Sequence, residues 1–409
     1  MTAAAVRFGS CDAERHWRPA GPAALPALRD PHAERLLGGM DELLAVLCGP
    51  DDVLVTRHRA PAAFAELMRE AGFGARHVTA PGPADLPVEQ RLAEHGLPGL
   101  EGAAAQPYAV VPGTHEAARR LGLAGTLPDL DALRRVNSKT WSTLLGLPGS
   151  GRVVTTLAEL DEAATVPCVL KDPYGVAGQG NRVVDSPARL ALVRRGLERL
   201  PQDHLELVVQ PLYERGDDFA AHLVVGPDGG TRWLGVRRLV NEGHSFRGSG
   251  PVTAGLMHRL DRAGYRETVE KVAAAAAAEG YHGPLTVDSM TTADGTLVPV
   301  LEVNARFSPG LIALHLGAPL RMAFVKVGDE RFFERFVQAL AERGRLAVGG
   351  RPGILPLAAS TLVPPRGWLF YAVLGEDAAD GRDTADNPDT ADGGTGADRC
   401  VAEILAALT

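Results

Sequence analysis

The sequence lacks several features that would place it in a familiar class of protein. Its four cysteines, Cys11, Cys48, Cys168 and Cys400, are scattered and form no CxxC pair, which favours reduced thiols over disulfides or a zinc site. No apolar run of about 18 residues is present, so no membrane span is predicted. The first residues lack the charged-then-apolar pattern of a signal peptide, so we expect a cytoplasmic protein.

Positive charge is not in excess, and two common catalytic signatures are missing. The net charge of −8 argues against a general nucleic-acid-binding surface. Neither a Walker A loop, which ends in Gly-Lys-Ser/Thr, nor a GxSxG nucleophile motif occurs. A chain of 409 residues is too long for one ordinary core, so two or three domains are expected.

Residues 1–130 alternate between strand-like and helix-like segments. Strands are predicted at Asp52–Thr56 and Tyr108–Pro112, and helices at Pro61–Ala71 and Thr114–Leu121. The segment 82–106 is rich in Pro, Gly and Ala and is predicted to be a loop. This alternation implies a parallel sheet.

The middle of the chain contains a lysine-bearing helix and a lysine-bearing strand. The helix runs from Lys139 to Leu145, and the strand Cys168–Lys171 leads into a glycine-rich segment. A later Gly/Ser-rich stretch, 241–256, is predicted to be a mobile loop, followed by a helix at Tyr265–Glu279.

The C-terminal part differs in composition from the rest. Residues 375–398 are acidic and rich in Gly and Ala, so they cannot bury much apolar surface and are predicted to be disordered. The final helix, Val401–Leu408, is expected to dock back onto the protein.

Two carboxylates flank a predicted turn at nearly equal distances. Asp294-Gly295 between alternating apolar residues indicates a β-hairpin that brings Asp288 and Glu302 opposite each other. Like charges facing across strands destabilise a sheet, and a cation between them would relieve this. Because side chains alternate along a strand, Glu302, Asn304 and Arg306 share one face. The oxygens of Asp288, Glu302 and Asn304 suit Mg²⁺, and the guanidinium of Arg306 suits a phosphate bound to that ion. The alternative is a solvated polar face of a hairpin.

Three further patterns suggest phosphate or nucleoside contacts. Lys171 precedes glycines at 175, 178 and 180, which let backbone N–H groups approach a phosphate, although an ordinary flexible hairpin has the same pattern. Lys139 lies in the first turn of a helix, where a solvated surface lysine is the alternative. The backbone of the crossover Gln210-Pro211-Leu212-Tyr213 could contact adenine, and Asp218 could bind the ribose hydroxyls. The alternative is a plain loop.

The order of these pieces resembles the ATP-grasp superfamily, and among its members the carboxylate–amine ligases typified by D-alanine–D-alanine ligase. The resemblance covers about residues 105–315 and is most specific over 302–310. It implies an N-terminal parallel α/β (pre-ATP-grasp) domain, 1–130, followed by a two-subdomain ATP-grasp fold. The implied subdomains are 131–212 (central) and 213–345 (with the Mg²⁺ hairpin), and residues 346–409 form a C-terminal extension.

The resemblance also implies a role for each matching residue. Lys139 and Lys171 would hold ATP phosphates, the loop 175–181 would close over them, and Arg306 would steady the transferred phosphoryl group. Asp288, Glu302 and Asn304 would ligate one or two Mg²⁺ ions. The nucleotide would be bound by Lys139, Lys171, Gly175, Gly178, Gly180, Gln210, Pro211, Leu212, Tyr213 and Asp218. Family members more often carry glutamate where this chain has Gln210 and Asp218.

The implied reaction joins a carboxylate, from an amino acid or small peptide, to an amine through an acyl phosphate, with release of ADP and phosphate. A lid is expected at 241–250, and Arg237, His244 and Arg247 are candidates to bind a substrate carboxylate, with surface solvation as the alternative. Two other functions stay open: loading an amino acid onto a carrier-protein thiol, and non-catalytic nucleotide binding. The expected partners are small molecules, with neither nucleic acid nor membrane, and a homodimer is compatible with the sequence.

Overall fold

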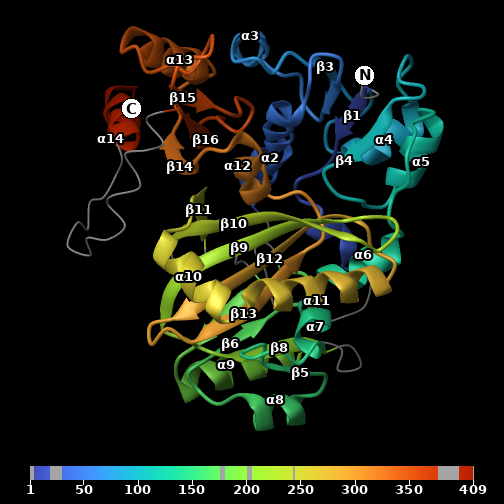
Figure 1. The fold of residues 1–409 in the computed structure, drawn as a ribbon, viewed down its shortest axis with the longest axis vertical. Helices are drawn as coiled ribbons and strands as arrows, with labels where there is room; N and C mark the ends of the chain where they lie inside the picture. Colours follow the sequence, from blue (N-terminus) through green and yellow to red (C-terminus); the bar gives the residue numbers. More distant parts are fainter. Residues whose placement is uncertain are drawn as a thin grey trace.

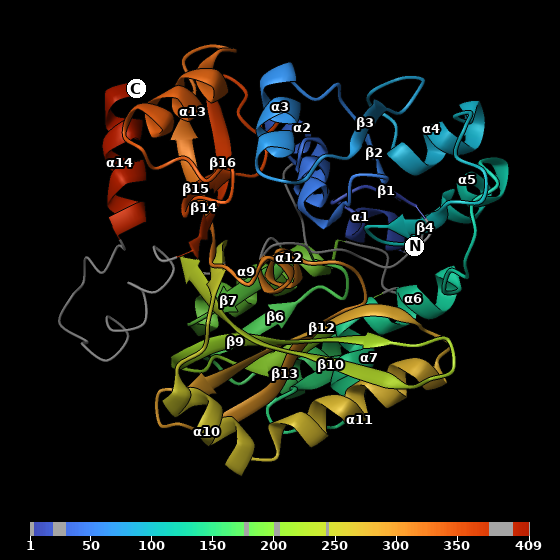
Figure 2. The same cartoon turned by 45° about the horizontal axis from the view of Figure 1, so that its top comes forward.

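The structure is a computed structural model that describes residues 4–18, 30–175, 180–199, 205–242, 245–375 and 396–408. Three sheets organise the chain (Figure 1). An eight-stranded sheet runs through the molecule, and its C-terminal strands lie beside a four-stranded N-terminal sheet (Figures 1 and 2). A second four-stranded sheet lies below the other strands of the large sheet in Figure 1. Among the described residues, no helix has the length and apolar character needed to cross a membrane.

The N-terminal sheet is parallel, as the sequence predicted, with strand order β3-β2-β1-β4. Its strands are β1 (Ala5–Phe8), β2 (Val53–Thr56), β3 (Arg76–Thr79) and β4 (Ala104–Pro107). The helices of this region are α1 (Glu14–Trp17), α2 (Pro31–Gly38), the 3₁₀ helix η1 (Met40–Leu47), α3 (Ala62–Glu70), α4 (Val88–His95) and α5 (Thr114–Arg120). The predicted helices at 61–71 and 114–121 correspond to α3 and α5.

Two predictions for this region are wrong. The segment 82–106 is not a loop, because it contains α4 and the start of β4. Val88 and Leu92 lie one helical turn apart and are both fully buried, which explains why α4 forms in a Pro- and Gly-rich stretch. The strand predicted at 108–112 lies earlier, at Ala104–Pro107, where Ala5 to Phe8 of β1 supply its hydrogen-bonding partners.

The central sheet is antiparallel, with strand order β5-β8-β6-β7. Its strands are β5 (Arg152–Val154), β6 (Cys168–Lys171), β7 (Asn181–Val184) and β8 (Leu207–Pro211). The helices around it are α6 (Leu130–Asn137), α7 (Lys139–Leu144), α8 (Leu157–Ala163) and α9 (Pro187–Leu197). The predicted lysine-bearing helix and strand are therefore α7 and β6, and both are brought to the same end of this unit.

The large sheet is antiparallel and has the order β13-β12-β9-β10-β11-β14-β16-β15. Its strands are β9 (Arg215–Val225), β10 (Thr231–Glu242), β11 (Ser245–Gly250), β12 (Gly283–Thr292), β13 (Leu297–Asn304), β14 (Leu320–Lys326), β15 (Gly353–Pro356) and β16 (Arg366–Leu374). The helices are α10 (Ala254–Arg262), α11 (Tyr265–Ala278), α12 (Pro309–Leu316), α13 (Phe332–Glu342) and α14 (Gly396–Leu408). Helix α11 lies across one face of the sheet (Figure 1).

The stretch predicted to be a mobile loop, 241–256, is not one over its described residues. It contains the end of β10, strand β11 and the start of α10. Strand β11 pairs with β10 on one side and β14 on the other, so pairing within the sheet overrides its Gly/Ser-rich composition. Whether the strand residues of 241–250 act as a lid stays a prediction, and His244 lies outside the described residues.

The C-terminal residues complete the large sheet instead of forming a separate appendage. Strands β16 and β15 extend it beyond β14, and α14 begins at Gly396, earlier than the predicted helix at 401–408. Most of the segment predicted to be disordered, residues 376–395, lies outside the described residues.

Buried contacts fix the N-terminal region onto this C-terminal part. The buried Glu42 carboxylate of η1 accepts hydrogen bonds from Ala359 N (2.6 Å), Ser360 N (2.8 Å) and Ser360 Oγ (2.6 Å). Phe64 of α3 packs edge-on against Phe333 of α13, with ring centroids 6.1 Å apart. One apolar core therefore runs from η1 and α3 through α13 into the large sheet.

Candidate active site

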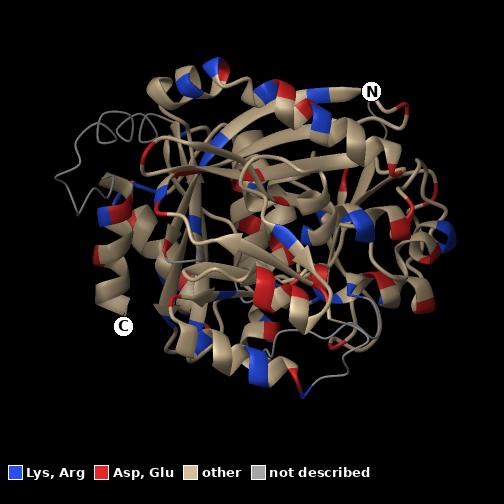
Figure 3. Cartoon of the chain, turned by 90° about the horizontal axis from the view of Figure 1, so that it is seen from below, with Lys and Arg blue, Asp and Glu red and all other residues tan. Residues whose placement is uncertain are grey.

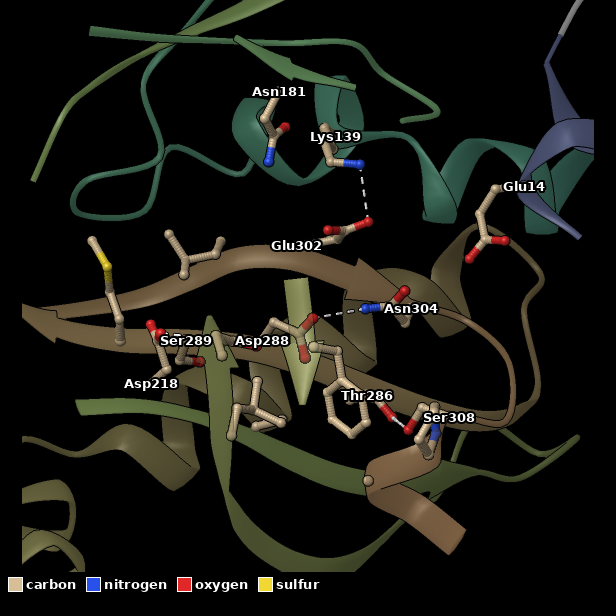
Figure 4. Close-up of a pocket in the computed structure, with 18 of the residues that line it drawn as sticks. Glu14, Lys139, Asn181, Asp218, Thr286, Asp288, Ser289, Glu302, Asn304 and Ser308 are labelled. Carbon is tan, nitrogen blue, oxygen red and sulfur yellow. Dashed lines mark hydrogen bonds and ion pairs between the residues drawn. The ribbon is translucent and has the colours of Figure 1, made fainter. Parts of the chain in front are cut away.

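A cavity of about 400 Å³ lies between the N-terminal region, the central unit and the large sheet. The central unit contributes Lys139 of α7 and Lys171 of β6. In the view of Figure 4, Lys139 lies above the hairpin of β12 and β13, which contributes Asp288, Glu302 and Asn304. The N-terminal region adds Glu14 at one side of the same space (Figure 4). Residues from all three predicted parts of the chain thus face one interior.

The predicted carboxylate pair is present at the predicted register. Asp288 and Glu302 are direct cross-strand partners of β12 and β13, and both line the cavity. Asn304 Nδ2 donates a hydrogen bond to Asp288 Oδ2 at 3.1 Å. Burial, followed by repulsion from Glu302, raises the pKa of Asp288 to about 7. The electrostatic repulsion between these two acids would be offset by a bound cation.

The two lysines are buried and point into the cavity, so neither is a solvated surface residue. Lys139 is 4% exposed, and its Nζ contacts Glu302 Oε1 at 2.9 Å and the Gly175 carbonyl at 2.8 Å. Lys171 Nζ donates to the Leu301 carbonyl at 3.3 Å. Burial, followed by the charge of Lys139, lowers the pKa of Lys171 to about 8. An anion binding between these ammonium groups would be favoured.

The ends of the glycine-rich loop lie close together at the base of this lysine pair. A Cβ atom on Gly175 would lie 2.4 Å from the Cα of Gly180, so this approach requires glycine. The Gly180 carbonyl accepts a hydrogen bond from Asp172 N at 2.8 Å, which closes the stem of the loop. Gly178 lies outside the described residues.

The predicted nucleoside-binding residues line the same cavity. Gln210 is buried and its Nε2 donates to the Gly149 carbonyl at 2.5 Å, while Pro211, Leu212 and Tyr213 continue the wall. Asp218 accepts hydrogen bonds from Arg215 at 2.8 Å and Asn241 at 3.0 Å. Apart from Gly178, the residues assigned to the nucleotide therefore lie in or beside one cavity.

Arg306 follows β13 and is held from two directions. Its Nη1 donates to Tyr108 Oη at 3.0 Å and to the Phe307 carbonyl at 2.8 Å, and its Nη2 forms an ion pair with Glu14. Glu14 was not identified from the sequence. The available signal was its position just after the first strand of a parallel sheet, since ligands bind beyond the carboxyl ends of such strands.

Two of the predicted substrate-binding residues do not line the cavity. Arg237 is buried, and its Nη2 donates to the Ala318 carbonyl at 2.6 Å. Burial, followed by the charge of Arg321, lowers its pKa to about 10. Arg247 lies over the Phe324 ring, 3.7 Å from its centroid, and pairs with Glu242. Arg237 Nε and Arg247 Nη1 are buried without a hydrogen-bond partner among the described residues, so the assignment of these arginines to a substrate stays a prediction.

A group of polar side chains on the cavity floor was also missed. His222 Nδ1 lies 3.0 Å from Thr286 Oγ1, which lies 3.1 Å from Ser308 Oγ, the N-cap of α12 (Figure 4). Burial, followed by the charge of Arg237, lowers the pKa of His222 to about 3, so this histidine is neutral at physiological pH. These residues come from three separate segments, and of the three only Ser308 lies within the stretch 302–310 that carried the resemblance.

The residues present fit a hard divalent cation. Carboxylate and amide oxygens are the ligands such ions prefer, and the Asp288–Glu302 pair supplies two acids that repel each other in its absence. The described residues contain no cluster of three or more His, Cys, Asp or Glu side chains suited to a metal ion. Any ion here would therefore also need oxygens from a second ligand, such as phosphates.

Comparison with known proteins gives a consistent result. No protein-family model matches the chain. The [butirosin acyl-carrier protein]–L-glutamate ligase of Niallia circulans is 23% identical over 297 residues, which cover 69% of this chain and 68% of that protein.

Solved structures match over nearly the whole chain. N5-carboxyaminoimidazole synthase of Aspergillus clavatus, in complex with ADP and 5-aminoimidazole ribonucleotide, has a TM-score of 0.52 at 12% identity and covers 99% of both chains. The ADP complex of the Staphylococcus aureus synthetase has a TM-score of 0.53 at 12% identity and covers 93% of this chain and 95% of its own.

These likenesses confirm the predicted fold: the chain has the ATP-grasp fold, preceded by a parallel α/β domain. Its sequence is similar to that of the ligase of Niallia circulans, in line with the resemblance that the motif at residues 302–310 had indicated.

Proposed function

We propose that the protein is an ATP-dependent ligase that activates a carboxylate as an acyl phosphate and joins it to an amine. The observation that carries this proposal is the convergence of Lys139, Lys171 and Arg306 on the Asp288–Glu302 pair within one cavity. Such a site provides cations for phosphates and acids for a metal, and burial raises the pKa of the Cys11 thiol that also lines the cavity, which disfavours its nucleophilic thiolate form. The site suits phosphoryl transfer, in which positioning and charge compensation supply most of the rate.

The reaction has two steps. A carboxylate oxygen of the substrate attacks the γ-phosphorus of ATP, and the bond to ADP breaks. The amine nitrogen then attacks the acyl carbon, phosphate leaves with the C–O bonding electrons, and the nitrogen loses a proton. The first step creates a good leaving group on an acyl carbon that is otherwise a poor electrophile at neutral pH.

The chain's own residues would divide the work between binding and charge compensation. Lys139 and Lys171 would bind phosphate oxygens, with Lys139 exchanging its contact to Glu302 for the nucleotide. Gln210 to Tyr213 would hold adenine, and Asp218 the ribose. Asp288, Glu302 and Asn304 would hold magnesium, which when bound offsets charge on the phosphates. Arg306, positioned by Glu14 and Tyr108, would neutralise the transferred group.

An amino acid is the favoured substrate because Glu14 has a spare acceptor. Glu14 is buried and lines the cavity, and the described residues provide no hydrogen-bond partner for its Oε2. A substrate ammonium group would supply that partner and balance the charge. The ligase of Niallia circulans, named for L-glutamate, also acts on an amino acid.

A carrier-protein thiol is the second candidate acceptor, favoured only by the name of that relative. Figure 3 shows basic and acidic residues interspersed along the ribbon in that view. The sequence contains no dense run of basic residues suited to an acidic carrier, so a small amine is the favoured acceptor. Mass spectrometry of a phosphopantetheinylated carrier after incubation with ATP and amino acids distinguishes the two.

The decisive experiment is an ADP-release screen over amino acids in pairs, with hydroxylamine included to trap an acyl phosphate as a hydroxamate. ADP and amide formation are expected for at least one pair. Nucleotide binding without ADP release under every mixture would instead indicate a non-catalytic nucleotide-binding module. Ultracentrifugation of the same samples separates a monomer from a homodimer, and cell fractionation tests the cytoplasmic location.

A further inference from the structure

We infer that one substrate of this enzyme carries a large hydrophobic side chain, aromatic or branched aliphatic, which binds at the end of the cavity between helix α2 and strands β14 and β16. The inference rests on the proposed function and adds a substrate class to it. Six side chains form the apolar wall of that end: Leu37, Met40, Met322, Phe324, Trp368 and Phe370.

The register of β14 and β16 makes one side of the apolar wall continuous. Met322 lies opposite Phe370, and Phe324 lies opposite Trp368, so each pair projects to the same face of the sheet. The Phe324 and Trp368 rings have centroids 6.5 Å apart. Four large apolar side chains therefore present one surface to the cavity.

Leu37 and Met40 form the other side, and fixed contacts hold the gap between the two sides. His32 Nε2, at the start of α2, lies 2.5 Å from the Arg366 carbonyl at the start of β16. Just after Met40, the Glu42 carboxylate binds two backbone N–H groups of the 359–360 turn. Because both sides are anchored to each other, the apolar end is a preformed space and cannot simply collapse.

Phe324 is unusually exposed for a residue of its type. It is 54% exposed, and the other exposed large hydrophobic residues of the described chain are Leu144 and Leu192, neither of which lines the cavity. The Arg247 guanidinium covers one face of the Phe324 ring at 3.7 Å. An exposed aromatic ring that is oriented by a cation and lines a cavity is well placed to bind an apolar ligand group.

The chemistry of the apolar wall selects against polar substrates. Its six side chains offer one conventional hydrogen-bond donor, the Trp368 indole N–H, and no charge. Except beside the Arg247 guanidinium, a carboxylate or amide placed there would lose its hydration without replacement, whereas a hydrophobic side chain would gain from burial. The wall therefore predicts a substrate unlike the L-glutamate for which the Niallia circulans ligase is named.

The test is the selectivity of ADP release. We expect leucine, phenylalanine or tryptophan to support turnover with higher kcat/KM than glycine, serine or glutamate, mainly through a lower KM. In the Phe324→Ala protein the ratio of kcat/KM for phenylalanine to that for glycine should fall roughly 10- to 100-fold. Leu192→Ala, which removes a leucine that is 64% exposed and lies outside the cavity, should leave that ratio unchanged.

Binding of phenylalanine by calorimetry, with magnesium and a nonhydrolysable ATP analogue, separates the two levels of the proposal. Turnover with polar amino acids only, or an unchanged ratio in Phe324→Ala, overturns the inference and leaves the ligase intact. Absence of ADP release with every pair refutes the ligase. In that case phenylalanine binding that is weakened by Phe324→Ala, but not by Leu192→Ala, would still support the apolar wall as its site.

Discussion

The two ends of the cavity are built in opposite ways. The charged end consists of short segments in which the functional residues are close in sequence, such as Glu302, Asn304 and Arg306. The apolar end joins Leu37 and Met40 to residues of β14 and β16, which come from the opposite end of the chain. Phosphate and metal chemistry therefore depends on local spacing, whereas the surface that would select a substrate depends on the complete fold.

The largest expected effect concerns the charged end. Glu302→Ala should reduce ATP turnover by at least about 10³-fold, because it removes a proposed magnesium ligand and the partner of Lys139. ADP release measures the loss, and circular dichroism should show an intact fold. Glu342→Ala, an exposed glutamate on α13, is the control. Full activity of Glu302→Ala would reject the metal assignment.

A loss of stability is expected where the two regions are joined. Glu42→Ala removes the acceptor of three hydrogen bonds and leaves Ala359 N and Ser360 N buried without it. The expected cost is about 3–5 kcal/mol, which thermal unfolding would report as a fall in Tm of several degrees. The variant should also raise KM for a hydrophobic substrate more than it lowers nucleotide affinity. If affinity for the hydrophobic substrate and for the nucleotide fell equally, the separation between the apolar and the charged end of the cavity would be contradicted.

A smaller effect is expected from the acid pair without magnesium. Because burial and Glu302 raise the pKa of Asp288 to about 7, the folded protein binds a proton that the unfolded chain releases near pH 4. The wild-type protein should therefore lose stability as pH rises from about 4 to 7. Asp288→Asn should abolish this dependence and raise Tm at neutral pH by about 2–4 °C. Saturating magnesium and nucleotide should remove the difference, and a pH-independent wild-type protein would refute the coupling.

The smallest effect is expected for the acidic segment. Replacing residues 376–395 with a short Gly/Ser linker should leave ADP release and Tm nearly unchanged, because that composition provides little apolar surface to bury. A loss of more than about twofold in turnover, or of several degrees in Tm, would refute the prediction of disorder.

The sequence predicted much of the charged end because its signals are local. The Asp-Gly turn set the register of Asp288 and Glu302, and the glycines after Lys171 marked a close backbone approach. Strand β11 was mistaken for a mobile loop because its Gly/Ser-rich segment is ordered by pairing with β10 and β14. Composition also could not reveal that Arg237 contacts the Ala318 carbonyl and Arg247 the Phe324 ring, outside the residues that line the cavity.

The position of β16 has a consequence for synthesis of the protein on the ribosome. The lysine-bearing unit and the metal hairpin can emerge and pair before residues 366–374 have left the exit tunnel, whereas Trp368 and Phe370 join the sheet last. A nascent chain would thus acquire its nucleotide pocket before its selectivity. A message truncated between these two stages would encode every residue proposed to bind ATP, together with Leu37 and Met40, but not the β16 part of the apolar wall.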